Sequence, residues 1–203
     1  LNSKILTYNL DWLHFSFAAT TFRKENVAKS INAQMGVSLR GYDVDIYPLK
    51  NQNCYSLMWK KVDKVHSISY SLLEKAKKIG LDNSINQEVI FPAVDTARFQ
   101  NKEAKKPLNT KKEIEILTVA RLHWIKGLDY TIEAMAQLSS INFRYTIVGN
   151  GIEYERLMST INELNLNNKV NLVGYIPNED LVSIYKKADI YVQYSIEEGF
   201  CNA

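Results

Sequence analysis

Two basic side chains stand close together in the sequence where a phosphate could bind. Arg121 directly follows an apolar run, and Lys126 precedes Gly127 at the start of a helical pattern. Two permanent cations beside a helix N-terminus can hold a phosphate or diphosphate, because charge-assisted hydrogen bonds add to the favourable end of the helix dipole. The same spacing is equally compatible with ordinary surface cations at a sheet edge.

Two further stretches carry residues that suit ligand contact. Gly149-Asn150-Gly151 follows an apolar run, and glycines there permit a tight turn and close approach of backbone to a ligand. Tyr154 stands where GxGxxG would place its third glycine, so a simple strand-to-helix turn explains the pattern better. The carboxylates of Glu197-Glu198 could accept hydrogen bonds from a sugar, although adjacent carboxylates are also common in solvated loops.

Taken in order, these stretches resemble the retaining glycosyltransferases of family 4, which have the GT-B fold of two Rossmann-like domains. The resemblance covers most of the chain and is strongest over residues 114–203. The matching segments are Val89–Phe99, Ala120-Arg121-Leu122 with Lys126-Gly127, Val148–Gly151, Gly174–Leu181, Ala188-Asp189 and Glu198–Cys201.

The resemblance implies roles for particular residues. Arg121 and Lys126 would hold the diphosphate of a nucleotide-sugar donor, with no metal and no other cofactor. Glu198 would contact the donor sugar, and Tyr175 and Ile176 would lie near the nucleotide base. Backbone N–H groups of the loop after Glu198 would help to bind the sugar or phosphate; these belong to Gly199, Phe200 and Cys201, the last standing in place of a family glycine.

The first half departs further from the family pattern. Where the family carries a histidine that reaches toward the donor sugar, this chain has Arg40, followed by Gly41 and Asp43. We expect these three residues on the acceptor or donor-sugar side. The second glutamate of the family's Glu-x7-Glu motif would fall at position 206, so we expect the chain to be a fragment with both domains truncated.

The resemblance implies a glycosyltransferase that moves a sugar from a nucleotide-diphosphate sugar to a polysaccharide or lipid-linked acceptor, with retention and without a metal. Two alternatives remain open: a GT-B nucleotide-sugar epimerase, and a non-catalytic nucleotide-sugar-binding fragment. Hydrolysis is disfavoured, because a glycosidase needs two carboxylates that flank the bond, and Glu197 and Glu198 are chain neighbours whose side chains should diverge.

The elements that must position these residues are clearest in the second half. Apolar strand patterns alternate there with helical ones, which predicts βαβ units and a parallel sheet covered on both faces. Ligands of such sheets bind beyond the carboxyl ends of the strands, so loops 121–127, 149–151, 174–178 and 195–202 should share one edge. Predicted strands are Ile114–Ala120, Tyr145–Val148, Val170–Val173 and Ile190–Val192; predicted helices are Leu128–Leu138, Ile152–Leu164 and a helix capped by Asn178 that ends at Lys187.

The first half is also α/β but less regular, and its pattern predicts that the opening strands of the domain are missing. Predicted there are strands Val37–Arg40, Val65–Ser69 and Glu88–Phe91, and a helix Tyr70–Ile79 that stops at Gly80. A polar segment over residues 100–112 has the composition of a linker. We therefore predict a partial acceptor-side domain at 1–107 and a nucleotide-sugar-binding domain at 108–203, with the boundary near Pro107.

Composition restricts the class of protein. The 203 residues are 46% hydrophobic and 23% charged, as in ordinary globular proteins, and no apolar run is long enough to span a bilayer. The chain starts at Leu1 without a leader-like pattern, so we expect a cytoplasmic protein that lacks its true start. Cys54 and Cys201 lack nearby metal-ligand partners in the sequence and should be reduced structural cysteines. For His14 a packed structural role is favoured over a position in a cleft.

Charge divides unevenly between the two halves. Residues 1–110 hold 16 Lys and Arg against 10 Asp and Glu, a net charge of +6, whereas residues 111–203 hold 9 against 12, a net charge of −3. A basic first half could contact an anionic membrane peripherally or an acidic acceptor, and a solvated lysine-rich surface explains it as well. Nucleic acid is not expected as a partner, because basic and aromatic residues are not interleaved in one motif.

Overall fold

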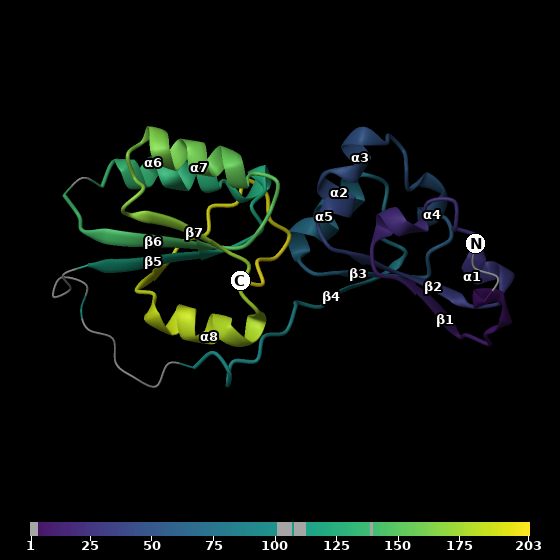
Figure 1. The fold of residues 1–203 in the computed structure, drawn as a ribbon. Coiled ribbons are helices and arrows are strands. Elements are labelled where there is room, and N and C mark those ends of the chain that lie inside the picture. Colours follow the sequence, from purple (N-terminus) through teal and green to yellow (C-terminus); the bar gives the residue numbers. More distant parts are fainter. Residues whose placement is uncertain (1–3, 101–106, 108–112, 139) are drawn as a thin grey trace. The chain divides into compact units, whose positions relative to one another are not determined.

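The computed structural model describes residues 4–100, 107, 113–138 and 140–203, which divide into two units (Figure 1). The first unit comprises the chain up to Ala93 together with Gly199–Asn202, and the second comprises Val94–Glu198 with Ala203. The predicted domain boundary near Pro107 adjoins residues 101–106 and 108–112, which lie outside the described residues. It therefore stays a prediction.

The first unit is built on a parallel sheet. Its described strands, in their order across the sheet, are β1 (Trp12–Phe15), β2 (Gln34–Leu39), β3 (Lys64–Ser67) and β4 (Asn86–Val89). The described helical segments are η1 (Ile5–Thr7), η2 (Ala18–Thr21), α1 (Val27–Ser30), α2 (Tyr42–Asp45), α3 (Tyr47–Lys50), α4 (Ser56–Trp59) and α5 (Tyr70–Lys78). The central strand β2 is buried from Met35 to Leu39, as expected for a parallel strand covered on both faces.

Some elements of the first unit differ from the sequence prediction. No strand was predicted before Val37, yet β1 pairs with β2 at the edge of the sheet. Its four residues, Trp-Leu-His-Phe, alternate between exposed and half-buried, and an apolar stretch this short does not by itself distinguish a strand from a helix. The helix α5 was predicted correctly: Ser69 caps it by accepting a hydrogen bond from Leu72 N, and Gly80 follows its end with φ 105°.

The second unit holds a second parallel sheet, in the order β7-β6-β5-β8. Helices α6 and α7 lie on one face of this sheet and α8 on the other (Figure 1). Such alternation confirms the predicted βαβ pattern. Its described elements are β5 (Ile114–Val119), η4 (Trp124–Lys126), α6 (Leu128–Ala136), β6 (Phe143–Val148), α7 (Tyr154–Glu163), β7 (Val170–Gly174), α8 (Asn178–Lys187) and β8 (Ile190–Tyr191).

Two details of the second unit correct the prediction. Asn178 is not the capping residue of α8: Pro177 holds that position with extended backbone, and Asn178 is the first helical residue. The helix predicted from Ile152 begins only at Tyr154, and Ile152 is 82% exposed. The backbone N–H of Glu153 is bonded instead to the Leu122 carbonyl, 3.2 Å away, so the turn before α7 is held by the neighbouring loop.

A packed core holds the strands of the second unit in position, and with them the loops at their carboxyl ends. The core between the sheet and helices α6 and α7 contains Ile132, Ile147, Leu157 and Ile161, each at most 2% exposed. Tyr145 is buried in this core, and the desolvation of its phenol raises its pKa to about 12.

None of the helices within the described residues is long and apolar enough to cross a membrane.

Candidate functional site

The carboxyl ends of the second sheet bring the predicted loops together. The Leu122 backbone N–H donates to the Asn150 carbonyl over 2.9 Å, and that of Gly149 donates to Gly174 over 2.8 Å. The loop over residues 195–202 is joined to the loop over residues 121–127, because the Ile196 N–H donates to the Ile125 carbonyl over 2.8 Å. These bonds confirm that segments of the four predicted loops share one edge, because parallel strands end on the same side of their sheet.

Gly149 serves the contact between loops. It has φ 142°, and a Cβ added there would collide with the Ala120 carbonyl oxygen. A side chain is therefore excluded both by the backbone conformation and by the neighbouring chain. The glycine pattern supports the interpretation as a strand-to-helix turn, since the close approach is to the backbone of the Arg121 loop.

Lys126 and Glu198 meet at this edge, although 72 residues separate them. The Lys126 ammonium donates to Glu198 Oε2, and the two side chains are 15% and 28% exposed. Ser195 Oγ donates to the same carboxylate oxygen over 3.0 Å. Lys126 ends η4, and Gly127 follows with φ 58°, a left-handed conformation that turns the chain into α6. The site therefore contains a half-buried cation and carboxylate next to a helix start.

Arg121 is the second predicted cation, and its environment differs. It follows β5 and is exposed. In the described part of the chain its guanidinium has no hydrogen-bond or ion-pair partner, so its five donor groups face solvent. An anion arriving at this edge would therefore find one cation already paired with Glu198 and one that is open.

The two residues predicted near a nucleotide base separate in the structure. Tyr175 is 70% exposed. Ile176 packs instead against the buried side chains of Leu117, Val148 and Ala188. Of the pair, only Tyr175 offers an exposed ring, and the prediction that either residue contacts a base stays a prediction.

The loop residues after Glu198 group with the first unit. Phe200 packs against the core of that unit, with its ring centroid 5.8 Å from that of Phe91. A Cβ on Gly199 would lie 2.8 Å from Leu72 Cδ1, while Cys201 is exposed. Their predicted contact with a sugar or phosphate is untested by this arrangement.

The turn after β2 holds the three residues predicted in the first unit. Asp43 is fully buried, and its carboxylate accepts from the backbone N–H groups of Arg40, over 3.0 Å, and Ala18, over 3.1 Å. Burial raises the pKa of this carboxyl, and the backbone hydrogen bonds oppose that shift. Gly41 adopts φ 121°, and the exposed Arg40 donates from Nε to the Ser16 carbonyl. Asp43 thus holds the turn together, and Arg40 presents its charge at the surface.

A chain of hydrogen bonds in the first unit was only partly anticipated. His14 Nε2 lies 2.8 Å from Ser38 Oγ, which lies 2.9 Å from His66 Nδ1, and His66 Nε2 lies 3.1 Å from the Ile90 carbonyl. Partial burial, together with the charges of His66 and Arg40, lowers the pKa of His14. A structural role for His14 was favoured from the sequence, but its partner residues could not be read from it.

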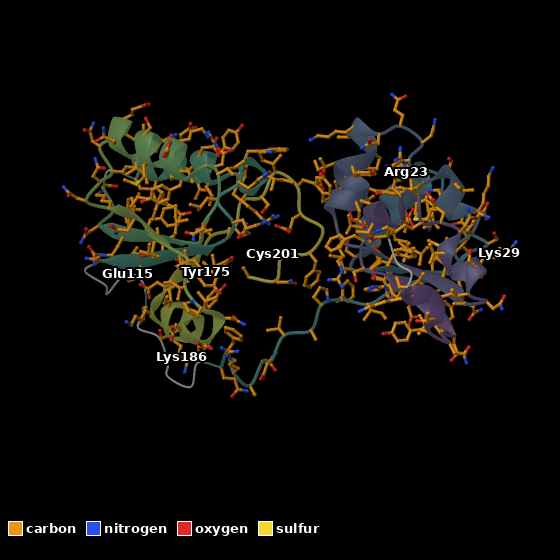
Figure 2. The ribbon with its side chains drawn as sticks, turned by 45° about the vertical axis from the view of Figure 1, so that its right-hand side comes forward. Arg23, Lys29, Glu115, Tyr175, Lys186 and Cys201 are labelled. Atoms are coloured by element: carbon orange, nitrogen blue, oxygen red, sulfur yellow. The ribbon has the colours of Figure 1, made fainter. Side chains whose placement is uncertain are left out.

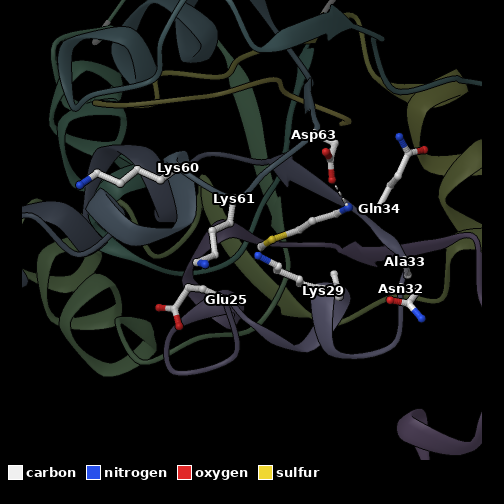
Figure 3. Close-up of a pocket in the computed structure, with 10 residues that line it drawn as sticks. Glu25, Lys29, Asn32, Ala33, Gln34, Lys60, Lys61 and Asp63 are labelled. Atoms are coloured by element: carbon white, nitrogen blue, oxygen red, sulfur yellow. Dashed lines mark hydrogen bonds between the residues drawn. The ribbon is translucent and has the colours of Figure 1, made fainter.

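A cavity of about 440 Å³ lies in the first unit where β2 and β3 begin (Figure 3). Lys29, Lys60 and Lys61 line it, together with two carboxylates that accept from the backbone, Asp63 from Met35 N and Glu25 from Arg23 N. It opens at the amino ends of the strands, away from the turn at Asp43. Among the described residues no group of three or more His, Cys, Asp or Glu side chains could hold a metal ion.

Comparison with known proteins matches the second half of the chain to one family model. The family model described as Glycosyl transferases group 1 matches residues 99–203. The Escherichia coli protein WcaL, which bears the name of a colanic acid biosynthesis glycosyltransferase, is 28% identical over 187 residues, covering 90% of this chain and 45% of WcaL. A Campylobacter jejuni enzyme named as an N-acetylgalactosaminyltransferase acting on a diphospho-undecaprenol acceptor is 29% identical over 154 residues, covering 76% of this chain and 41% of that enzyme.

Solved structures share the fold. Anabaena HepE, determined in complex with UDP and glucose, superimposes with a TM-score of 0.78 at 16% identity, covering 97% of this chain and 56% of HepE. Sucrose-phosphate synthase from Thermosynechococcus elongatus gives 0.80 at 20% identity, covering 98% and 54%. These likenesses confirm the predicted α/β class and GT-B-like architecture. The chain spans about half the length of these proteins and less than half that of the two sequence relatives.

Proposed function

The chain belongs to the group 1 glycosyl transferases, and from this membership we propose that the protein transfers a sugar from a nucleotide-diphosphate donor to a polysaccharide or lipid-linked acceptor. We place it in the retaining family 4. The donor diphosphate binds at the carboxyl edge of the second sheet, against Arg121 and Lys126, and Glu198 contacts the donor sugar.

The pairing of Lys126 with Glu198 is the observation that carries this proposal. It joins the cation implied for the diphosphate with the carboxylate implied for the sugar, and these groups must be neighbours if one donor is to touch both. The open guanidinium of Arg121 supplies a second charge on the same edge. Bidentate donation from arginine suits phosphate oxygens, and the N-terminus of α6 adds a favourable dipole.

The chemistry follows from where charge develops. Transfer breaks the bond between the anomeric carbon and the diphosphate oxygen, and forms a bond from that carbon to the acceptor oxygen, whose proton is released. Negative charge grows on the departing diphosphate, where nearby cations stabilise the transition state more than the ground state. Arg121 and Lys126 fill this role, so the proposed reaction requires no metal ion or other cofactor.

The acceptor class is supported by the relatives. The names of WcaL and of the Erwinia amylovora protein AmsK refer to the biosynthesis of colanic acid and amylovoran. The name of the Campylobacter enzyme refers to a lipid-linked diphosphate acceptor. We propose an acceptor of the same chemical class for this protein, a growing polysaccharide or a lipid-linked sugar.

We also propose that the protein works on the cytoplasmic side of a membrane, with peripheral contact through its basic first half. The net charge of +6 over residues 1–110 favours an anionic lipid surface. Sedimentation with vesicles of anionic lipid, but not with neutral ones, is the expected result, and it should weaken as salt is added. Equal sedimentation with both would contradict the charge-based contact.

The diphosphate site is tested by titrating the full-length protein with UDP. We expect Arg121→Ala and Lys126→Ala each to weaken UDP binding by about tenfold, the loss of one charge-assisted contact of roughly 1.5 kcal/mol. Lys186→Ala is the matched control, because Lys186 is an exposed lysine in the last turn of α8 (Figure 2). Unchanged UDP affinity in both site variants would contradict the assigned diphosphate site.

A further inference from the structure

A line of side chains leads from β8 to Glu198. The Tyr191 hydroxyl lies 2.9 Å from Gln193 Oε1, Gln193 Nε2 lies 2.7 Å from Ser195 Oγ, and Ser195 Oγ lies 3.0 Å from Glu198 Oε2. Tyr191, Gln193 and Ser195 are every second residue of one short segment, and Glu198 follows three residues after Ser195. The line ends on the carboxylate that receives the Lys126 ammonium.

Only one direction of hydrogen donation fits this line. An ionised carboxylate accepts and cannot donate, so Ser195 must give its single proton to Glu198. Ser195 then accepts from its other neighbour, which requires the amide nitrogen of Gln193 to face it. The Gln193 carbonyl oxygen is left to accept from Tyr191. Each group therefore fixes the orientation of the next, and the serine hydroxyl is not free to turn away from Glu198.

The line also distinguishes the two oxygens of Glu198. Oε2 receives both the Lys126 ammonium and the Ser195 hydroxyl. In the described part of the chain Oε1 has no hydrogen-bond partner. A carboxylate offers about four acceptor positions, so Oε1 keeps the capacity to accept a hydroxyl group.

We propose that Ser195 and Gln193 are positioning residues that hold Glu198 by one oxygen and keep the other directed toward a hydroxyl group of the donor sugar. The inference rests on the proposed function and deepens it. Without Ser195, the carboxylate is free to turn both oxygens toward Lys126. It then withdraws the acceptor that the sugar needs.

The test compares two ligands on the same full-length protein. UDP reports the diphosphate site, and UDP-glucose adds a sugar, so the ratio of their dissociation constants measures what the sugar contributes. We expect Ser195→Ala to reduce the advantage of UDP-glucose over UDP by about tenfold, the loss expected for one hydrogen bond to a charged group. The affinity for UDP itself should stay within about twofold, and Ser195→Thr should restore the advantage because it keeps the hydroxyl.

Gln193→Leu tests the next member of the line. It removes the donor that orients Ser195 without touching Glu198, so we expect a smaller reduction of the ratio, about threefold. Ser159→Ala is the matched control. Ser159 Oγ donates to Glu163 Oε1 over 2.9 Å on the exposed side of α7, which is the same pair of groups away from the site.

Three outcomes separate this inference from the proposed function. An unchanged ratio in Ser195→Ala, with Glu198→Gln losing it, would overturn the positioning role and leave the function standing. Equal affinity for UDP and UDP-glucose in the unmodified protein, with Lys126→Ala weakening both, would overturn the sugar contact of Glu198 and this inference with it. An affinity for UDP that is unchanged in both Arg121→Ala and Lys126→Ala would instead overturn the diphosphate site.

Discussion

Each unit carries a carboxylate near the carboxyl edge of its sheet, and the two carboxylates are used differently. Asp43 in the first unit is 0% exposed, and each of its oxygens accepts a backbone N–H. Glu198 in the second unit is 28% exposed, and one of its oxygens receives two side-chain donors. Both residues were predicted to lie near a sugar, but only Glu198 keeps an oxygen without a protein partner in the described structure.

Under the proposed function, the difference is between a carboxylate that holds the fold together and one that keeps an acceptor oxygen for a ligand. Backbone N–H groups cannot move away without breaking the turn that they belong to, so both oxygens of Asp43 stay bonded within the fold. Side-chain donors such as Lys126 can exchange one partner for another when a ligand arrives. On the proposed function, partial exposure and a movable partner are what separate Glu198 from Asp43.

Glycines at the two edges extend the comparison and give the largest expected effect. Gly149 and Gly41 both have positive φ, but a Cβ on Gly149 would meet the Ala120 backbone, whereas one on Gly41 would have only Asp45 Oδ2 nearby, at 3.9 Å. We expect Gly149→Ala to destabilise the second unit by about 4 kcal/mol, from backbone strain plus overpacking, and Gly41→Ala to destabilise the first by about 2 kcal/mol, from strain alone.

Hydrogen exchange resolved by peptide measures the stability of each unit separately. Protection should fall in β5 and β6 for Gly149→Ala, and around the β2–α2 turn for Gly41→Ala. Equal losses in the two variants would mean that loop contact adds nothing to the need for glycine at position 149.

The two carboxylates themselves give the next largest effect. Asp43→Ala leaves the N–H groups of Arg40 and Ala18 without their acceptor, and we expect a loss of about 3 kcal/mol in the stability of the first unit. Glu198→Ala should cost less than about 1 kcal/mol, because the ion pair is partly exposed, yet it should abolish most of the sugar's contribution to donor binding. Urea unfolding beside UDP-glucose titration checks both.

A reversed pattern would break the comparison. If Asp43→Ala kept the free energy of unfolding of the unmodified protein but lost donor binding, the first-unit carboxylate would be the ligand contact. Asp43→Asn is the milder companion variant, since its amide keeps one acceptor oxygen and should retain part of the stability.

Much of this arrangement could be predicted from the sequence, for identifiable reasons. The apolar run of β5 and the helical spacing of α6 belong to regular elements with buried residues, so the sequence pattern reflects that burial. The parallel order then follows from strand–helix alternation, and with it the shared edge of the four loops. The sequence alone assigns Arg121, Lys126 and Glu198 to that edge.

The remaining features depend on long-range contacts that no local pattern contains. The contact of Lys126 with Glu198 spans 72 residues, and the burial of Asp43 depends on a backbone amide at Ala18, 25 residues earlier. The strand β1 escaped prediction because its short apolar stretch is interrupted by His14 and is too short to distinguish a strand from a helix. The line through Ser195 had one local signal, a serine three residues before the glutamate.

The smallest expected effect concerns His14, in the hydrogen-bonded chain of the first unit. Its pKa is lowered first by desolvation and then by His66 and Arg40, so the folded state binds its proton less readily than the unfolded state. Stability contributed by neutral His14 is therefore present above the unfolded pKa, near pH 6.5, and is lost as pH falls through the folded pKa. Because the ring is largely exposed, solvent screening limits the effect to below about 0.5 kcal/mol.

His14→Gln should flatten the pH dependence of first-unit stability between about pH 5 and pH 7, since glutamine keeps a hydrogen-bonding group but does not titrate there. Hydrogen exchange of β1 and β2 peptides at several pH values measures the slope, and His123→Gln in the second unit is the control. A slope that survives His14→Gln would assign the titration to another group. Because Ser38 joins the two histidines, the partner variant His66→Gln then identifies whether that group is His66.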